Sequence, residues 1–464
     1  MPHHISSSLP HLEDAFVFAK NNNYINMQSI ALEGWRRGLD LTFYRDGKNK
    51  IKYSLSNGKS THHFLSSKET NSNAIRNIEK TKQRFSKNNV PIPKGKFFKP
   101  GIGHEELISY AIEIEFPVVL KVVNSSHRPF LNIQNLKELK SILDKYKKRF
   151  ASRKLLIEKF IEGDELNFFI IENKVISVAK KIPITVIGTG KDSIHKLINY
   201  LNTEREKYSY LNNKLIKVNK RLKNILSKKN YTINSIPKQN EQVDLQKISD
   251  LSNKGDSVNV TTQVTDDLKD IAIQAGNAVS SVPCYEVKMI ANFQKNTETV
   301  LSVNTTPNIA DHLLPTEGDP IDIPKKIIDY YFPGTKDFNR SYFYFNFEKI
   351  NDLLNSHSAT SINVTNCPKN KFFAKLYLVS GKVQKVSYRK WISKKAKRHN
   401  LYGYTRNLDN GDVEVLVAGE ENTVNEFKQI CLKGPKKARV ENIKEFDWEK
   451  PVEIGFEIKP TKTI

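Results

Sequence analysis

The chain has 464 residues, of which 38% are hydrophobic, and this excludes an intrinsically disordered protein. Its net charge of +24 favours acidic partners such as nucleotides and acyl phosphates, although drift in composition would give the same excess of Lys. We expect no nucleic-acid groove, since no arginine stripe or interleaved aromatics accompany the lysines. Three scattered cysteines exclude a disulfide framework. Without a signal peptide or an apolar run of ~18 residues, we expect a soluble, cytoplasmic protein that contacts no membrane.

The first two thirds of the chain predict alternating helices and strands. Residues 1–71 form an N-terminal α/β segment, with helical spacing followed by two short strands around turns at Asp46-Gly47 and Asn57-Gly58. The stretch 165–182 predicts two strands joined at Glu172-Asn173. Residues 266–279 predict a helix that leads into strands over 284–292 and 299–304. The composition changes near 333–340, where we place the main domain boundary.

From Phe372 the predicted order is strand, helix, strand, turn, strand, helix, strand, which is the βαββαβ order of a ferredoxin-like fold. The loop 381–387 lies between a strand and a helix N-terminus, where free N–H groups and the helix dipole favour an anion. The guanidinium of Arg389 can hold a phosphate through two hydrogen bonds, and the amide of Asn407 can orient a water molecule. By itself, an arginine in the first turn of a basic helix, such as Arg389, is more often a solvated charge than a phosphate ligand.

The motifs "VSYR", "YTRNL" and "GPKKARV" occur in this order within residues 369–464, and this region resembles the acylphosphatase family. The resemblance implies that Arg389 binds phosphate and that Asn407 positions the attacking water. It also implies a phosphate cradle formed by Gln384, Lys385, Val386 and Ser387. The family usually has Gly where Lys385 stands, and Gly permits positive φ. The Lys therefore affects turnover more than binding.

Residues 72–335 resemble the ATP-grasp superfamily, near its cyanophycin-synthetase and glutathione-synthetase-like branch. The segments "NIEKTKQRFSKNNVPIPKG", "FPVVLKVV", "LIEKFIEGDELNFFII" and "VLSVNTTPN" carry the resemblance. It implies ATP as cofactor, with the phosphates near three lysines, the adenine near residues 158–161 and the ribose near an acidic side chain. The implied ATP-binding residues are Lys80, Lys121, Glu158, Lys159, Ile161, Glu165 and Lys181. Lys121 interrupts an apolar strand, so it should meet a ligand or an ion pair.

The resemblance also implies a Mg²⁺ site made by Glu and Asn on one strand and Asp on the next. Ser302 and Lys288 stand at the two carboxylate positions, and only Asn304 remains. Because Mg²⁺ in proteins normally takes at least one or two carboxylate ligands, these replacements argue against Mg²⁺. Glu286 reaches the site only after a shift of about 6–7 Å along its strand. The segment 124–131 also replaces the glycine-rich phosphate loop.

The fold class is therefore α/β and α+β multidomain: an ATP-grasp fold, a linker over 336–368 and an acylphosphatase-like domain over 369–464. We expect a ligase-like protein with an impaired metal site, joined to a domain that binds phosphate and for which the resemblance implies hydrolysis of acyl phosphates. Two alternatives stay open. One is an active ATP-dependent carboxylate–amine ligase in which Lys288 supplies charge in place of the metal. The other is a non-catalytic partner subunit of a second ATP-grasp ligase. The expected ligands are a nucleotide and an acyl phosphate or carboxylate.

Overall fold

The computed structural model describes Leu9, Leu211 and residues 22–46, 50–64, 77–123, 129–206, 214–246, 255–295, 297–336, 341–369 and 371–463. The chain divides into two compact units. One comprises the described residues between 67 and 323, and the other combines those between 9 and 66 with those between 324 and 464. No helix in the described part of the chain has the length and hydrophobicity needed to cross a membrane.

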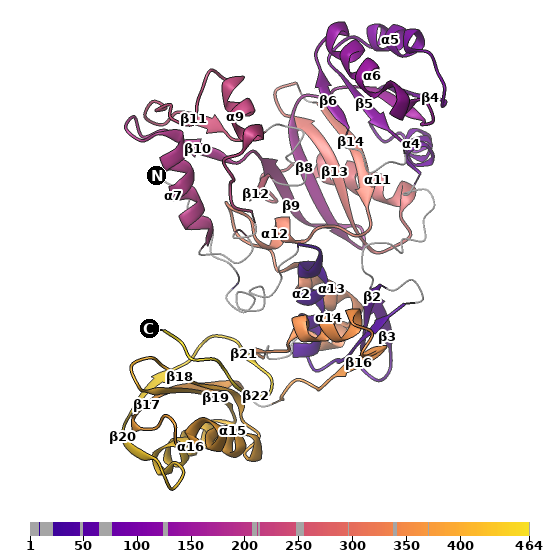
Figure 1. Ribbon diagram of the computed structural model, residues 1–464. Helices are drawn as coiled ribbons and strands as arrows, with labels where there is room; N and C mark the ends of the chain where they lie inside the picture. Colours follow the sequence, from indigo (N-terminus) through magenta and orange to yellow (C-terminus); the bar gives the residue numbers. More distant parts are fainter. Residues whose placement is uncertain are drawn as a thin grey trace. The chain divides into compact units, whose positions relative to one another are not determined.

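The main sheet of the first unit has five strands in the order β12-β9-β8-β13-β14. These strands are β8 (Asp164–Ile171), β9 (Lys174–Ile182), β12 (Asp256–Asn259), β13 (Cys284–Asn292) and β14 (Thr297–Asn304). Apolar residues such as Phe168, Val287 and Met289 point to one face, where they pack with α11 (Asp266–Val279) and with Phe85 of α4 (Ile78–Lys87). Figure 1 shows the position of α11 beside this sheet. The alternation that buries this face leaves the polar residues of the same strands on the other face.

A second sheet of this unit has the order β4-β7-β5-β6 and packs with α5 (His104–Glu113) and α6 (Leu136–Phe150). Its strands are β4 (Gly95–Phe98), β5 (Val118–Val122), β6 (Phe130–Ile133) and β7 (Leu155–Lys159). A short segment, residues 160–163, connects β7 to β8 of the main sheet. Farther along, β10 (Thr185–Ile187) pairs with β11 (Gln242–Asp244) and packs with α7 (Ile194–Glu206) and α9 (Lys220–Ser227).

The second unit contains a four-stranded sheet in the order β16-β1-β2-β3, beside α2 (Asn22–Arg36). Its strands are β1 (Asp40–Arg45), β2 (Ile51–Ser56), β3 (Thr61–Phe64) and β16 (Ser361–Val364). The expected linker 336–368 thus differs from the structure, since it contains β15 (Phe343–Tyr344), α14 (Phe347–Asn355) and β16. The physical reason is a partner distant in sequence: β16 pairs with β1, and Val364 is buried beside Leu41.

The C-terminal sheet has the order β20-β17-β19-β18-β22, with α15 (Tyr388–Arg398) and α16 (Glu421–Lys433) packed on one face (Figure 1). Its strands are β17 (Phe373–Lys382), β18 (Tyr402–Asn407), β19 (Val413–Gly419), β20 (Arg439–Asp447) and β22 (Phe456–Ile458). From β17 to β20 the elements follow the βαββαβ order expected from the sequence. After β20 the chain continues through β21 (Val452–Glu453), which pairs with β15.

Candidate functional site

The strand register of the main sheet gathers its polar residues on the face opposite α11. We call this set the polar face. Its members are Ser177 and Lys181 on β9, Glu165 and Asn167 on β8, Glu286 and Lys288 on β13, and Ser302 and Asn304 on β14. Because cross-strand partners share a face, the pairings Glu165 with Lys181 and Lys288 with Ser302 bring residues far apart in sequence together.

Lys288 and Glu165 form an ion pair in the middle of the polar face. Their Nζ and Oε1 atoms lie 2.9 Å apart, and both side chains are mostly buried. Ile290 is directly opposite Glu165 on the neighbouring strand, and Lys288 is therefore the diagonal neighbour of Glu165. A long side chain can span this diagonal. Ser302, the other expected carboxylate position, is exposed opposite Lys288. An ammonium group therefore occupies the place where a metal-binding carboxylate was expected.

The neighbouring oxygen atoms are also engaged elsewhere. Glu286 Oε2 lies 3.4 Å from Nε2 of the buried His312, whose Nδ1 is 3.0 Å from Ser177 Oγ. The amide oxygen of Asn304 accepts a hydrogen bond from the backbone N–H of Thr306. Among the described residues there is no group of three or more His, Cys, Asp or Glu side chains suited to a metal ion. The residues on the polar face thus do not fit Mg²⁺, which requires several hard oxygen ligands in octahedral geometry.

Lys181 is also neutralised by a carboxylate. Its Nζ lies 3.0 Å from Asp311 Oδ1, with both side chains almost fully buried, and it donates a hydrogen bond to the carbonyl of Gly255. Asp311 lies on the short helix α12 (Ala310–Leu313). Burial alone would raise the pKa of Asp311, but Lys181 and Lys214 outweigh it and hold that pKa below its usual value.

Glu158 is the centre of charge in the second sheet. Its carboxylate contacts Lys121, with Oε2 and Nζ 2.6 Å apart, and also contacts Lys82 on α4. Burial opposes the charged form of Glu158, but the two ammonium groups together hold its pKa below the usual value. Since one carboxylate serves two lysines, burial still lowers the pKa of Lys82. Lys121 keeps 23% of its side chain exposed, so its cation is only partly enclosed.

Lys82 is a residue that the sequence reasoning missed in favour of Lys80. Lys80 is exposed, whereas Thr81 and Phe85 are buried and Lys82 shares their side of α4. Helical periodicity could have identified Lys82, because residues four positions apart lie on the same side of a helix. Lys82 follows Ile78 by four residues, whereas Lys80 follows it by only two. The other missed residues are the buried His312, Ser177 and Asp311, for which local sequence gives no signal.

The remaining expected nucleotide contacts lie at the end of β7. Lys159 Nζ donates hydrogen bonds to the carbonyls of Glu115 and Phe116, 3.1 and 3.3 Å away. Ile161 is half-buried in the segment between β7 and β8. Most of the altered phosphate loop, residues 124–128, lies outside the described residues, and Pro129 is its first described position.

In the C-terminal domain, residues 383–387 form the loop between β17 and α15. Lys385 and Ser387 adopt left-handed backbone conformations, with φ of 60° and 63°. Two side chains anchor the loop: the amide nitrogen of Gln384 donates to the carbonyls of Leu408 and Asp412, and Tyr388 Oη donates to the carbonyl of Cys431. Val386 points into the core. The expected phosphate cradle is therefore held at both ends.

Arg389 and Asn407 flank this loop. Arg389 is in the first turn of α15, is half-buried, and makes no hydrogen bond or ion pair with the described residues. The side chain of Ser387, the residue before α15, makes no capping hydrogen bond to the first N–H groups of the helix. Asn407 is the last residue of β18, next to the carbonyl of Leu408 that Gln384 holds. Its amide oxygen is buried and has no hydrogen-bond partner among the described residues, which leaves it available to a bound water or ligand.

Comparison with known proteins finds similar proteins for both parts of the chain. Residues 375–458 match the family model described as Acylphosphatase. The chain is 24% identical, over 323 residues, to a glutathione biosynthesis bifunctional protein from Clostridium perfringens, covering 66% of this chain and 41% of the relative. It is 23% identical, over 264 residues, to cyanophycin synthetase from Synechocystis, covering 55% of this chain and 30% of the relative. A bifunctional glutathione synthetase structure from Pasteurella multocida has a TM-score of 0.48 and 19% identity, covering 62% of this chain and 41% of that one.

These findings confirm both resemblances. The C-terminal region is an acylphosphatase-like domain, and the central region has the ATP-grasp fold. The chain thus has a C-terminal domain that matches the acylphosphatase family model, and a preceding region that is similar in sequence to glutathione and cyanophycin synthetases. It spans less than half the length of these two relatives.

Proposed function

We propose that this protein hydrolyses acyl phosphates at the loop 383–387, and that its ATP-grasp module binds nucleotide without a catalytic Mg²⁺. The observation that carries the first half is the pairing of two unengaged groups beside one loop. These groups are the guanidinium of Arg389 and the buried amide oxygen of Asn407. A cation at a helix N-terminus binds phosphate, and an unpartnered acceptor nearby binds water.

Each group has a defined step in the proposed reaction. Arg389 and the N–H groups of the loop hold the phosphate oxygens. The amide oxygen of Asn407 accepts a hydrogen bond from a water molecule. This hydrogen bond orients the water so that a lone pair of the water oxygen points at phosphorus. A new P–O bond forms as the bond between phosphorus and the acyl oxygen breaks. The carboxylate leaves with the electron pair, and both protons of the water go to the released phosphate, which leaves as H2PO4⁻.

The second half of the proposal concerns the ATP-grasp module. ATP would lie between the two sheets of the first unit, near Lys121, Glu158 and residues 159–161, as the resemblance implies. Lys288, already paired with Glu165, would offer the phosphates at most one positive charge. Since an ammonium group cannot chelate two phosphate oxygens as a divalent metal does, phosphoryl transfer in this module would be impaired. The ion pair between Lys288 and Glu165 supports this reading.

Steady-state hydrolysis of benzoyl phosphate tests the proposed activity. We expect the wild-type chain to release phosphate in the presence of EDTA. Arg389→Ala and Asn407→Ala should each lower kcat/KM by roughly 100-fold, as does removal of one transition-state hydrogen-bond donor in other enzymes. Lys390→Ala is the matched control, because Lys390 is an exposed neighbour on the same helix. Equal turnover in all four proteins would refute the assignment.

A further inference from the structure

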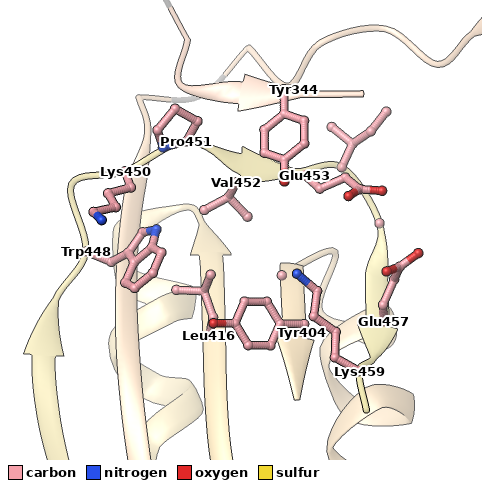
Figure 2. Close-up of a pocket in the computed structure, with 13 residues that line it drawn as sticks. Tyr344, Tyr404, Leu416, Trp448, Lys450, Pro451, Val452, Glu453, Glu457 and Lys459 are labelled. Atoms are coloured by element: carbon pink, nitrogen blue, oxygen red, sulfur yellow. The ribbon is translucent and has the colours of Figure 1, made fainter. Parts of the chain in front are cut away.

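A cavity lies on the face of the C-terminal sheet that α15 and α16 leave open. β20 and β22 are at opposite edges of this sheet, so the chain between them must cross the open face. We call this crossing segment, residues 448–455, the strap. Between the strap and the sheet is a cavity of about 240 Å³ (Figure 2). That is the volume of roughly eight water molecules at about 30 Å³ each, enough for a small organic ligand.

The cavity is lined by aromatic and apolar side chains. Tyr404 and Leu416, cross-strand partners on β18 and β19, form its floor. Tyr344 of β15 and Val452 of the strap line the opposite wall, and Trp448 closes one end (Figure 2). Tyr344 and Tyr404 are each 8% exposed, so the surrounding structure holds their rings. Walls of this kind favour a ligand with an apolar or aromatic portion.

Trp448 and Lys459 offer unengaged hydrogen-bond donors at the cavity, which the exposed Lys450 also lines. Trp448 Nε1 is buried and has no acceptor among the described residues. Lys459 Nζ lies 4.1 Å from the centroid of the Tyr404 ring and, in the described part of the chain, forms no ion pair. Figure 2 shows Lys459 reaching over the Tyr404 ring. A buried N–H group without an acceptor is unfavourable, so an acidic ligand group placed between the indole of Trp448 and the ammonium group of Lys459 would be favoured.

Two carboxylates lie across the cavity from Trp448. Glu453 and Glu457 line the side of the cavity away from the indole (Figure 2). Glu453 Oε1 accepts a hydrogen bond from Asn346 Nδ2 at 3.0 Å. Burial raises the pKa of Glu453, and the charge of Glu457 raises it further, while Asn346 and Lys459 act against this. A cationic ligand group at this side would relieve the repulsion between the two carboxylates.

We propose that this cavity binds a free α-amino acid with an aromatic or large apolar side chain. Its carboxylate would contact Trp448 Nε1 and Lys459, its ammonium group would face Glu453 and Glu457, and its side chain would pack on Tyr344 and Tyr404. A simple anion would be repelled by the two glutamates, and a simple cation by Lys459. The proposal is independent of acyl phosphate hydrolysis, since the cavity shares no residue with the loop 383–387.

Isothermal titration of the full chain tests this site with L-phenylalanine and two blocked analogues. N-acetyl-L-phenylalanine lacks the ammonium group, and L-phenylalaninamide lacks the carboxylate. We expect L-phenylalanine to bind and each analogue to bind at least about 10-fold more weakly, which corresponds to ~1.4 kcal/mol. This comparison uses the wild-type protein, so it does not depend on the folding of any variant.

Substitutions then locate the site. Lys459→Met should weaken L-phenylalanine binding at least about 10-fold, and Trp448→Phe should weaken it by several-fold, as expected for one lost hydrogen bond. Lys462→Met is the matched control, because Lys462 is exposed and does not line the cavity. Absence of L-phenylalanine binding at ~10 mM, equal binding of the N-acetyl analogue, or unchanged binding by Lys459→Met would each overturn the proposal.

Discussion

Lys288 Nζ lies 2.9 Å from Glu165 Oε1 on the polar face of the main sheet. These two residues come from positions where the ATP-grasp resemblance implies a metal ligand and a ribose contact. Their ion pair satisfies both charges within the protein. A divalent cation would have to displace an ammonium group from its carboxylate before it could bind there.

Restoring the expected carboxylates should restore the metal site. In the double variant Lys288→Asp, Ser302→Glu, the two new carboxylates and the native Asn304 would supply the expected metal ligands. We predict that this variant binds ATP at least about 10-fold more tightly with Mg²⁺ than with EDTA. Lys288→Met is the control, because it removes the ammonium group without adding a ligand. Fluorescence anisotropy of a labelled ATP analogue measures the effect. A double variant as indifferent to Mg²⁺ as the control would contradict the prediction.

The buried carboxylate of Glu158 should be important for the stability of the second sheet. Glu158→Gln leaves Lys82 and Lys121 without their counter-charge and should cost about 3–5 kcal/mol. Lys121→Met should cost less, because Lys82 still pairs with the carboxylate. Hydrogen exchange of the β5 and β7 amides measures the local free energy of opening. Equal losses in the two variants would show that Glu158 does not join the lysines into one network.

The stability of the first unit should fall in acid. The pKa values of Glu158 and Asp311 are lowered from their usual 4.5 and 3.8, so on acidification the unfolded chain binds protons first. Their contribution is therefore complete above the usual values and is lost as the pH falls through the lower folded-state values. Urea unfolding between about pH 6 and pH 3 should show this decline. Glu158→Gln should show a smaller decline over the same range, and an equal one would count against the assignment.

Lys385 offers a test of backbone conformation at the phosphate loop. An L residue with φ of 60° is strained by roughly 1–2 kcal/mol relative to Gly. Lys385→Gly should therefore raise the free energy of unfolding of the C-terminal domain by about 1 kcal/mol, whereas Lys385→Ala should not. Hydrogen exchange measures this free energy. The Ala variant removes the same charge but retains Cβ. If both variants lower phosphate affinity equally, the ammonium group of Lys385 assists binding. If Gly destabilises the domain, the proposed strain is absent.

Local sequence predicted the elements whose geometry depends on near neighbours. The helix over 266–279 is α11. The turn predicted at Glu172-Asn173 joins β8 to β9, with left-handed φ of 46° and 61°. In the N-terminal segment, the sequence predicted two strands where the structure has three, and the linker prediction missed β16. The pairing of β16 with β1 joins residues more than 300 positions apart, which no local pattern reveals.

The candidate sites also contain some residues that local sequence predicts and others that depend on distant parts of the chain. Arg389 and Asn407 follow from motifs that lie within one βαβ segment, and the structure places both beside the loop 383–387. The partners of Lys121, Lys181 and Lys288 could not be predicted, because strand register and helix docking decide which carboxylate each lysine meets. Glu165 and Lys288, for example, are 123 residues apart. The cavity under the strap depends on the path of the strap across the sheet, for which the sequence has no signature.

Binding of ATP to the wild-type chain, measured by isothermal titration with Mg²⁺ and with EDTA, is the most direct test of the charge replacement at Lys288. We predict the same affinity, within about twofold, in the two buffers, because the carboxylates of the polar face, Glu165 and Glu286, already face Lys288 and His312. A gain of about 10-fold or more with Mg²⁺, lost in Asn304→Ala, would contradict it and would show that the module keeps a working metal site.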